Sequence, residues 1–360
     1  MLSTGTVWGQ TEIDELSDID NADGHYVITQ NISGGTAGVT TFNGTLEAAI
    51  DPTTHMPYRI SGLTAPLFTT LTGTVKNLVF ENVAITSGTD VGAVASTANG
   101  DARIYNVGIL SGSVGGSGNV GGLVGLLDGT ARVVNCYSYA NITSGGSTSN
   151  PKKYVGGLVG NNSQSSNQDD IKTVVVNSMF YGEINTTNCS NYAPVYGNNA
   201  IKNDLTKKVN NVNVGYGINP YCYFLGTAAF QTQYTKIDNY NRTWPADEEY
   251  LTRFEYYRSI LNSNRQLMAW WATGDQTDTA AIFKWVLDPS VARYPILKKW
   301  GKYPSIINPD PTRTWDPEAD GGNGAWQARS SANPYRGNSF GTLTVTVNAG
   351  SHHAGAGATT

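Results

Sequence analysis

The sequence predicts an all-β protein: a right-handed parallel β-helix that carries a small helical C-terminal cap and a trailing linker. Two observations lead to this prediction. The motif Val-Gly-Gly-Leu-Val-Gly occurs at residues 120–125 and again at residues 155–160, and a looser copy begins at Val91. Apolar positions also recur at a fixed spacing. Internal repeats indicate a stacked architecture, because one repeat cannot bury its apolar face alone.

The second repeated feature is an asparagine that lies between β-branched residues. It occurs at Asn77, Asn106, Asn135 and Asn177, with steps of 106 − 77 = 29, 135 − 106 = 29 and 177 − 135 = 42 residues. The longer step contains polar stretches at 144–153 and 161–170. Surface turns tolerate insertions better than the strands they connect, so the spacing indicates one repeated unit with turns of variable length.

Around the asparagines, the repeats align in apolar columns. The members of the three columns are Val75, Ile104, Val133 and Val175; Leu78, Val107, Cys136 and Ser178; and Phe80, Ile109, Ser138 and Phe180. Short β-branched segments that are interrupted by Gly and Asn predict strands. We expect the four asparagines to form a ladder inside the coil, because stacked side-chain amides can donate to one neighbour and accept from the other.

The two best copies of the motif resemble a known repeat family. The residues that carry the resemblance are Gly122, Leu123, Val124, Gly125, Gly157, Leu158, Val159 and Gly160. With the Asn-Cys or Asn-Ser strand that follows each copy, they are similar to GLUG repeats, and the resemblance covers about residues 58–196. That family occurs in bacterial surface proteins, including adhesins and the non-catalytic parts of immunoglobulin A proteases. The resemblance implies an extracellular β-helix and implies no particular activity.

Taken in order, the chain divides into five parts. Residues 1–65 are expected to form an N-terminal cap and the first coils, with a clear strand at 26–32, and residues 66–225 hold the repeats. Solenoids need atypical end repeats to block pairing at their open edges. Residues 1–4 do not form a signal peptide, so we expect either a piece of a longer exported protein or an exported protein whose leader has been removed.

The pattern changes after the repeats, and residues 226–306 are expected to form a helical cap with closing strands. Residues 244–249 have Pro in the first turn and acidic residues at the positive end of the helix dipole, which predicts a helix start. A second helical stretch, 265–272, ends before Gly274. We expect this cap to cover the last coil. Residues 307–338 are rich in Pro, Asp, Gly and Asn and predict a linker, and residues 339–360 begin a truncated following β domain.

Composition excludes several classes of partner. Charged residues make up 14% of the 360 residues, and the net charge is −5. No Lys/Arg cluster is long enough to follow a phosphate backbone, so we expect no nucleic-acid partner. No apolar run is long enough to predict insertion into a membrane. We expect a monomer within a larger chain. The three cysteines have no metal-ligand spacing, and whether Cys189 and Cys222 form a disulfide stays open.

A catalytic site requires titratable groups that converge, and the sequence shows no such set. The carboxylates of the repeats, including Glu81, Asp90 and Glu183, are scattered over different columns. We therefore expect no catalytic residue, no cofactor, no metal site and no enzymatic function. The enzyme alternative is a polysaccharide lyase or hydrolase, because such sites occur on parallel β-helices and need clustered carboxylates.

Aromatic side chains recur instead, on what we expect to be the outer face of one sheet. Tyr139 and Tyr181 share a column, and Tyr137 occupies the neighbouring column. Exposed tyrosines can stack on sugars or on a protein surface, and the alternative is that they stabilise the sheet through cross-strand pairing. The sequence thus predicts an extracellular, cell-surface binding or adhesion module that contacts a glycan or a host protein through Tyr137, Tyr139 and Tyr181. A passive stalk is the remaining alternative.

Overall fold

The computed structural model describes most of the N-terminal two thirds of the chain and part of the rest. The described residues are 9–145, 154–163, 173–186, 189, 191–199, 222–225, 243–246, 248–263, 265–299, 313–316 and 325–328. The chain divides into two compact units, Met1–Lys299 and Trp300–Thr360. All features discussed below belong to the first unit, except one strand pair of the second.

The largest sheet of the first unit has thirteen strands. They are β1 (Thr11–Ile13), β2 (His25–Ile28), β3 (Ile32–Ser33), β5 (Thr45–Ala48), β6 (Arg59–Ser61), β8 (Thr74–Glu81), β11 (Arg103–Ile109), β15 (Arg132–Val134), β16 (Tyr137–Ser138), β20 (Val174–Val176), β21 (Met179–Phe180), β25 (Cys222–Leu225) and β26 (Thr243–Ala246). Every strand pairing in this sheet is parallel.

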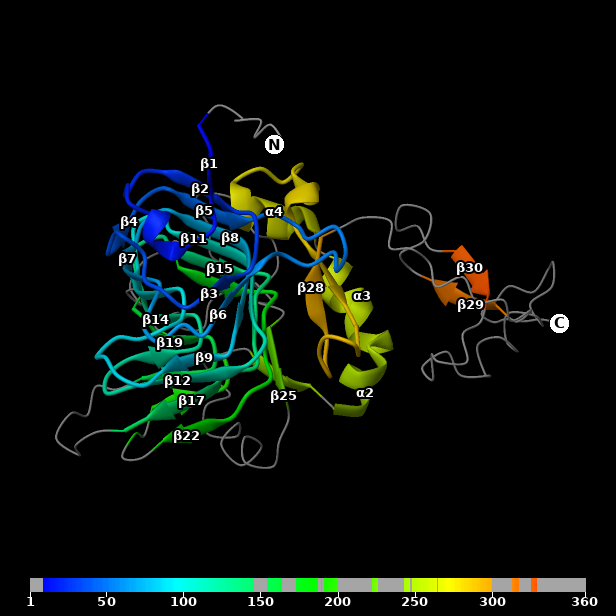
Figure 1. Ribbon diagram of the computed structural model, residues 1–360. Helices are drawn as coiled ribbons and strands as arrows, with labels where there is room; N and C mark the ends of the chain where they lie inside the picture. The colour runs from blue at the N-terminus through cyan, green and yellow to red at the C-terminus, as the bar shows by residue number, and fades with distance from the viewer. Residues whose placement is uncertain are drawn as a thin grey trace. The chain divides into compact units, whose positions relative to one another are not determined.

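Three smaller parallel sheets accompany it (Figure 1). The six-stranded sheet contains β4 (Thr41–Phe42), β7 (Phe68–Leu71), β10 (Ala95–Ala98), β14 (Val124–Leu127), β19 (Val159–Asn162) and β24 (Tyr196–Asn199). The four-stranded sheet contains β9 (Val83–Ile85), β12 (Gly112–Gly116), β17 (Asn141–Ser144) and β22 (Ile184–Thr186). The three-stranded sheet contains β13 (Val120–Gly121), β18 (Val155–Gly156) and β23 (Tyr192–Ala193).

The chain visits these sheets in the same order in each repeat. It runs from β8 through β9 and β10 to β11, and then from β11 through β12, β13 and β14 to β15. In the thirteen-stranded sheet, Ile104 pairs with Val75 and with Val133, and Val133 pairs with Val175, which is the predicted register. The described chain is therefore mostly β, with parallel sheets and few helices, which confirms the all-β prediction.

Side chains from all four sheets form one hydrophobic core. The columns that begin with Val75, Leu78 and Phe80 lie in it, and the leucines and valines of the two repeated motifs are also fully buried. Near the N-terminal end, the rings of Phe42 and Phe68 stack with centroids 4.6 Å apart. Aromatic rings from neighbouring repeats thus pack on one another in the core, which is how repeats stabilise one another.

The glycines of the repeated motif allow the backbone to pack closely. A Cβ added at Gly157 would lie 2.0 Å from the carbonyl oxygen of Pro194 and 2.2 Å from the Phe180 ring. A Cβ at Gly122 would lie 2.4 Å from the carbonyl oxygen of Gly157. Only glycine fits at these positions, because real Cβ atoms do not approach other atoms so closely.

The C-terminal part of the first unit consists of three α-helices, a 3-10 turn and a strand pair, which we call the cap. Its elements are α2 (Glu248–Arg253), α3 (Glu255–Ser263), α4 (Arg265–Thr273), η2 (Thr279–Ala281), β27 (Lys284–Val286) and β28 (Ile296–Lys298). The strands β27 and β28 pair antiparallel. A further 3-10 turn, η1 (Leu16–Asp18), lies near the N-terminus. None of the helices in the described chain is long and apolar enough to cross a membrane.

The position of the cap differs from the prediction that it covers the last coil. It lies against the outer face of the thirteen-stranded sheet (Figure 1), in contact with residues from several repeats. Val79, Tyr137 and Met179 pack against β27 and β28, whereas Tyr105 and Val134 pack against α4. The physical reason is that these outward side chains are apolar and recur in successive repeats from Val79 onward, so this part of the face requires cover.

Two element predictions also change. Residues 243–246 form β26, parallel to β25, where the sequence predicted a helix start, and the helix begins at Glu248. Pairing with an otherwise open strand edge outweighs the local helix signal. The second unit contains an antiparallel pair, β29 (Arg313–Asp316) and β30 (Ala325–Ala328), where a linker was predicted. Residues 339–360 lie outside the described residues.

Candidate functional site

The four asparagines of the repeats form a column of hydrogen-bonded amides. Asn106 Nδ2 donates to Asn77 Oδ1, Asn135 Nδ2 donates to Asn106 Oδ1, and Asn177 Nδ2 donates to Asn135 Oδ1, each at 2.8 Å. All four residues have positive φ, between 50° and 56°. Asparagine adopts this left-handed conformation more readily than other residues with a Cβ. The amides all point the same way along the column.

The ladder faces the cap and not the interior of the coil, which corrects the expected location. Asn106 Nδ2 also donates to the carbonyl oxygen of Ala281, and Phe283 N donates to Asn106 Oδ1. Asn135 and Asn177 donate to the carbonyl oxygens of Phe283 and Leu261. Side chains of a regular strand alternate between its two faces, and the left-handed asparagine interrupts this alternation. As a result, Ile104 and Val107 both point into the core, while Asn106 points out.

The tyrosines predicted to contact a ligand are covered by the cap. Tyr137 is fully buried and Tyr181 is 5% exposed, and the Tyr137 ring lies 6.1 Å from that of Trp285. The Tyr139 hydroxyl donates to the carbonyl oxygen of Tyr294 at 2.8 Å and accepts from Tyr294 N at 2.9 Å. The expectation of an exposed aromatic face was therefore wrong, because the cap covers these tyrosines. Nothing in the sequence indicated that the cap packs on this face of the sheet.

Burial also fixes the chemistry of these tyrosines. Removal from water raises the pKa of Tyr137, Tyr139 and Tyr181, because the low dielectric disfavours the phenolate. They therefore stay neutral, and their hydroxyls can act only as hydrogen-bonding groups. Their structural partners are the cap residues named above, so the three tyrosines belong to the contact between sheet and cap.

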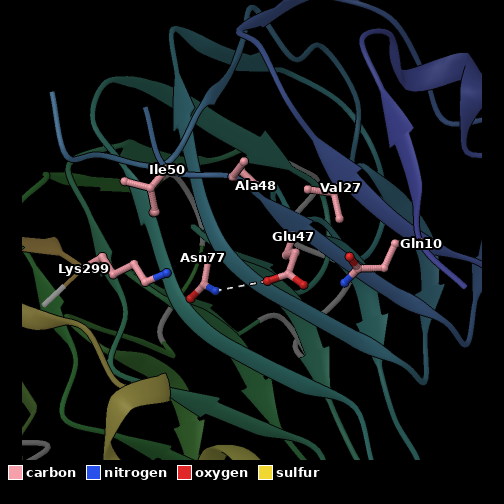
Figure 2. Close-up of a pocket in the computed structure, with 8 residues that line it drawn as sticks. Gln10, Val27, Glu47, Ala48, Ile50, Asn77 and Lys299 are labelled. Carbon is pink, nitrogen blue, oxygen red and sulfur yellow. Dashed lines mark hydrogen bonds between the residues drawn. The ribbon is translucent and has the colours of Figure 1, made fainter. Parts of the chain in front are cut away.

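The amide ladder leads to a polar hollow at its N-terminal end. Asn77 Nδ2 donates to Glu47 Oε2 at 3.3 Å, and the other oxygen of Glu47 lies 3.1 Å from His25 Nε2 and 3.4 Å from Lys76 Nζ. Gln10 Nε2 lies 3.1 Å from the same imidazole nitrogen. Figure 2 shows Glu47 and Asn77 joined by this hydrogen bond at the edge of the hollow.

The hollow has a volume of about 370 Å³ and combines polar walls with a small apolar floor. Its lining residues are Gln10, Val27, Glu47, Ala48, Ala49, Ile50, Asn77 and Lys299. They come from the first strands of the thirteen-stranded sheet and from the last residue of the first unit. In Figure 2 the Lys299 ammonium group points from the cap side toward Asn77, across from Glu47 and Gln10. Ligand pockets are commonly built in this way, with few polar groups on an apolar base.

Glu47 is the principal charged group of this site. Its side chain is 18% exposed, so it is partly desolvated yet open to the hollow. Asn77 donates to the carboxylate, Lys76 forms an ion pair with it, and His25 Nε2 lies within hydrogen-bonding distance, and charge-assisted contacts of this kind are stronger than neutral hydrogen bonds. The site therefore presents an oriented acceptor, Glu47, and the exposed ammonium group of Lys299 on the other side of the hollow. This arrangement supports hydrogen-bonded recognition of a small ligand.

The sequence analysis did not single out Gln10, His25, Glu47 or Lys299. A usable signal existed for Glu47, because subtracting the 29-residue step from Lys76 gives position 47, and these residues pair in adjacent strands. The contributions of Gln10 and Lys299 had no such signal, since residues distant in sequence meet at the site only in the folded chain.

The cysteines and the acidic and histidine side chains of the described residues are the remaining candidates for other chemistry. Cys136, Cys189 and Cys222 are all free thiols, and burial raises the pKa of Cys136 and of Cys222 to about 12. These two thiols are therefore unreactive at neutral pH, because the thiolate is the nucleophile. In the part of the chain that the structure describes, no three His, Cys, Asp or Glu side chains are grouped so that they could hold a metal ion.

Comparison with known proteins connects the N-terminal repeats with a peptidase family. Residues 19–111 match the family model described as the M26 IgA1-specific metallo-endopeptidase N-terminal region. A stretch of 104 residues is 39% identical to an immunoglobulin A1 protease from Streptococcus sanguinis. That stretch is 29% of this chain and 5% of the length of the relative.

The matches overturn the prediction that this protein is not an enzyme, because the matched family is a family of peptidases. The prediction was wrong because it rested on the lack of a convergent catalytic set in these 360 residues. The match is to the N-terminal region of the family, and the relative is a much longer protein. The described residues do not supply the ligand set that a metallo-endopeptidase needs for its metal, so we assign them no metal-dependent step.

Proposed function

We propose that this chain forms the substrate-recognition region of a secreted or surface peptidase of the immunoglobulin A1 protease type. The observation that carries the proposal is the family match over residues 19–111. That span includes the strands β2, β5 and β8, which contribute Glu47 and most of the polar hollow around it. A peptidase that cleaves one large glycoprotein benefits from a binding surface that holds the substrate near its catalytic part.

We further propose that the parallel sheets belong to a right-handed β-helix with GLUG-type repeats. The support is that successive repeats visit the sheets in one order and that every pairing between repeats is parallel. Connections between parallel strands of one sheet are almost always right-handed. A stacked array of this kind is stiff, because each repeat packs on the next, and stiffness lowers the entropic cost of binding.

The test is to measure binding of the 360-residue chain to immobilised IgA1 by surface plasmon resonance, with immunoglobulin G as the control ligand. We expect saturable binding to IgA1 and none to immunoglobulin G. Absence of saturable binding to IgA1 at a concentration of about 1 mM, which corresponds to about 4 kcal/mol, would contradict the proposal. Equal binding to both immunoglobulins would also contradict it.

Adhesion to host glycans or host surface proteins is the second candidate function. It is supported by a hydroxyl-bearing row on the six-stranded sheet, where Thr41 pairs with Thr70 and Thr70 pairs with Thr97. All three threonines are at least partly exposed. Adhesion predicts binding to many glycoproteins, whereas substrate recognition predicts a preference for IgA1. A passive stalk predicts binding to neither, so the same experiment separates the three functions.

A further inference from the structure

We propose that the hollow beside Glu47 binds one neutral pyranose unit of a glycoprotein. This inference rests on the proposed function, because it names the part of a substrate that the site would hold. It concerns residues at the N-terminal end of the amide ladder, where the hollow opens beside Asn77 and Glu47.

The size limits the ligand to a small unit. The hollow measures about 370 Å³, which is at the lower end of the range for small-molecule sites. A single sugar ring fits such a volume, whereas a folded peptide segment does not. Val27, Ala49 and Ile50 supply partly exposed apolar side chains to the lining. The face of a pyranose ring that carries C–H groups is itself weakly apolar and can contact these side chains.

The polar groups match hydroxyls, which both donate and accept hydrogen bonds. Glu47 supplies a carboxylate whose orientation is already fixed by His25, Lys76 and Asn77. Lys299 supplies an ammonium donor on the opposite side, and Gln10 supplies an amide. A fixed acceptor lowers the entropic cost of binding, since it does not need to be ordered by the ligand.

The charge balance disfavours the other small ligands of this size. The lining contains one carboxylate and one ammonium group, and the adjacent Lys76 is already paired with Glu47, so a phosphate would meet the single ammonium group of Lys299 and no cluster of cations. No aromatic side chain lines the hollow, so a nucleobase or an aromatic amino acid would find no stacking partner. A free carboxylate on the ligand would approach Glu47 and be repelled by it. A neutral sugar avoids each of these penalties.

The experiment uses the 360-residue chain and methyl glycosides of glucose, galactose, mannose, N-acetylglucosamine and N-acetylgalactosamine, with sialic acid as an anionic comparison. Saturation-transfer NMR detects weak binding, and titration gives the Kd. The variants are Glu47→Gln, which removes the charge of the fixed acceptor, and Lys299→Ala, which changes an exposed side chain. The control is Glu81→Gln on the same sheet, because Glu81 pairs with Arg59 outside the hollow.

We expect saturable binding of at least one neutral glycoside and an approximately tenfold loss of affinity in Glu47→Gln, with a smaller loss in Lys299→Ala and none in Glu81→Gln. Melting curves report whether each variant folds. If Glu47→Gln does not fold, Lys299→Ala still tests the inference. Three results would overturn the inference: no neutral glycoside binds, sialic acid binds better than every neutral glycoside, or neither pocket variant weakens binding.

Binding of the same variants to IgA1 distinguishes failure of the sugar inference from failure of the proposed function. Binding to IgA1 that is unchanged by both pocket variants and by enzymatic deglycosylation would overturn the sugar inference and leave the proposed function standing. Glycoside binding by a chain that does not bind IgA1 would contradict the proposed function while keeping the sugar site. Loss of IgA1 binding both on deglycosylation and in Glu47→Gln supports the two together.

Discussion

At the scale of the residue, one asparagine per repeat sets both backbone shape and side-chain contacts. Asn106 holds φ at 54°, and its amide bonds to the asparagines before and after it and to the cap. An alanine at that position would keep neither property. Glycine would keep the backbone conformation and lose only the amide, so the two substitutions separate the two roles.

We expect Asn106→Ala to lower the free energy of unfolding by about 3 kcal/mol, and Asn106→Gly to lower it by about 2 kcal/mol. The amide loss leaves buried groups such as Phe283 N without their partner, and the alanine adds the cost of a left-handed backbone. Urea denaturation followed by circular dichroism measures both values. Unchanged stability in Asn106→Ala would show that the ladder contributes nothing.

At the scale of the element, tyrosine side chains of the sheet contact the cap, and their hydroxyls contribute differently to the free energy of folding. Tyr139 exchanges two hydrogen bonds with Tyr294, and Tyr181 donates to the carbonyl oxygen of Pro295 at 2.8 Å. The Tyr137 hydroxyl, by contrast, is buried and has no hydrogen-bond partner among the described residues. A satisfied buried hydroxyl stabilises the fold, whereas an unsatisfied one costs free energy.

Removing these two hydroxyls should therefore have opposite effects. We expect Tyr139→Phe to destabilise the protein by about 1–2 kcal/mol, because it leaves Tyr294 N and its carbonyl unpaired. Tyr137→Phe should be neutral or slightly stabilising, and it serves as the matched control because the substitution is identical. Thermal melting of both variants checks the result. An equal loss in the two variants would contradict the assigned contacts.

At the scale of the whole molecule, two hydrophobic clusters join the cap to the outer face of the thirteen-stranded sheet. The outer face of the thirteen-stranded sheet presents Val79, Tyr105, Val134, Tyr137 and Met179 to the cap, and all five are buried. Without the cap this face would be a large apolar patch, and such patches cause association.

We expect a chain that ends after Ala246 to be insoluble or oligomeric, because deletion of residues 247–299 uncovers this face. A chain that ends at Lys299 is the control and should remain monodisperse, since it removes only the second unit. Size-exclusion chromatography with light scattering distinguishes the two outcomes. A soluble chain ending at Ala246 that melts cooperatively would contradict the role assigned to the cap.

The sequence alone determined the strands of the repeats, their register and the asparagine column. These features follow from local sterics and from periodicity: β-branched residues favour strands, asparagine tolerates left-handed dihedrals, and the 29-residue step places Val75, Ile104 and Val133 in register. The motif glycines belong to the same class, because close backbone packing leaves no room for a side chain at Gly157.

Only the tertiary structure decided what covers the outer face and where a polar hollow forms. The aligned columns predict that Tyr137 and Tyr181 point out of the coil. An outward side chain is exposed to solvent only if no later segment of the chain packs on it, and here the cap does. The cap returns from more than a hundred residues downstream, and the free energy of burying apolar surface determines its position. The same return brings Lys299 beside Glu47 and Asn77, so the candidate site depends on a long-range contact that no local pattern encodes.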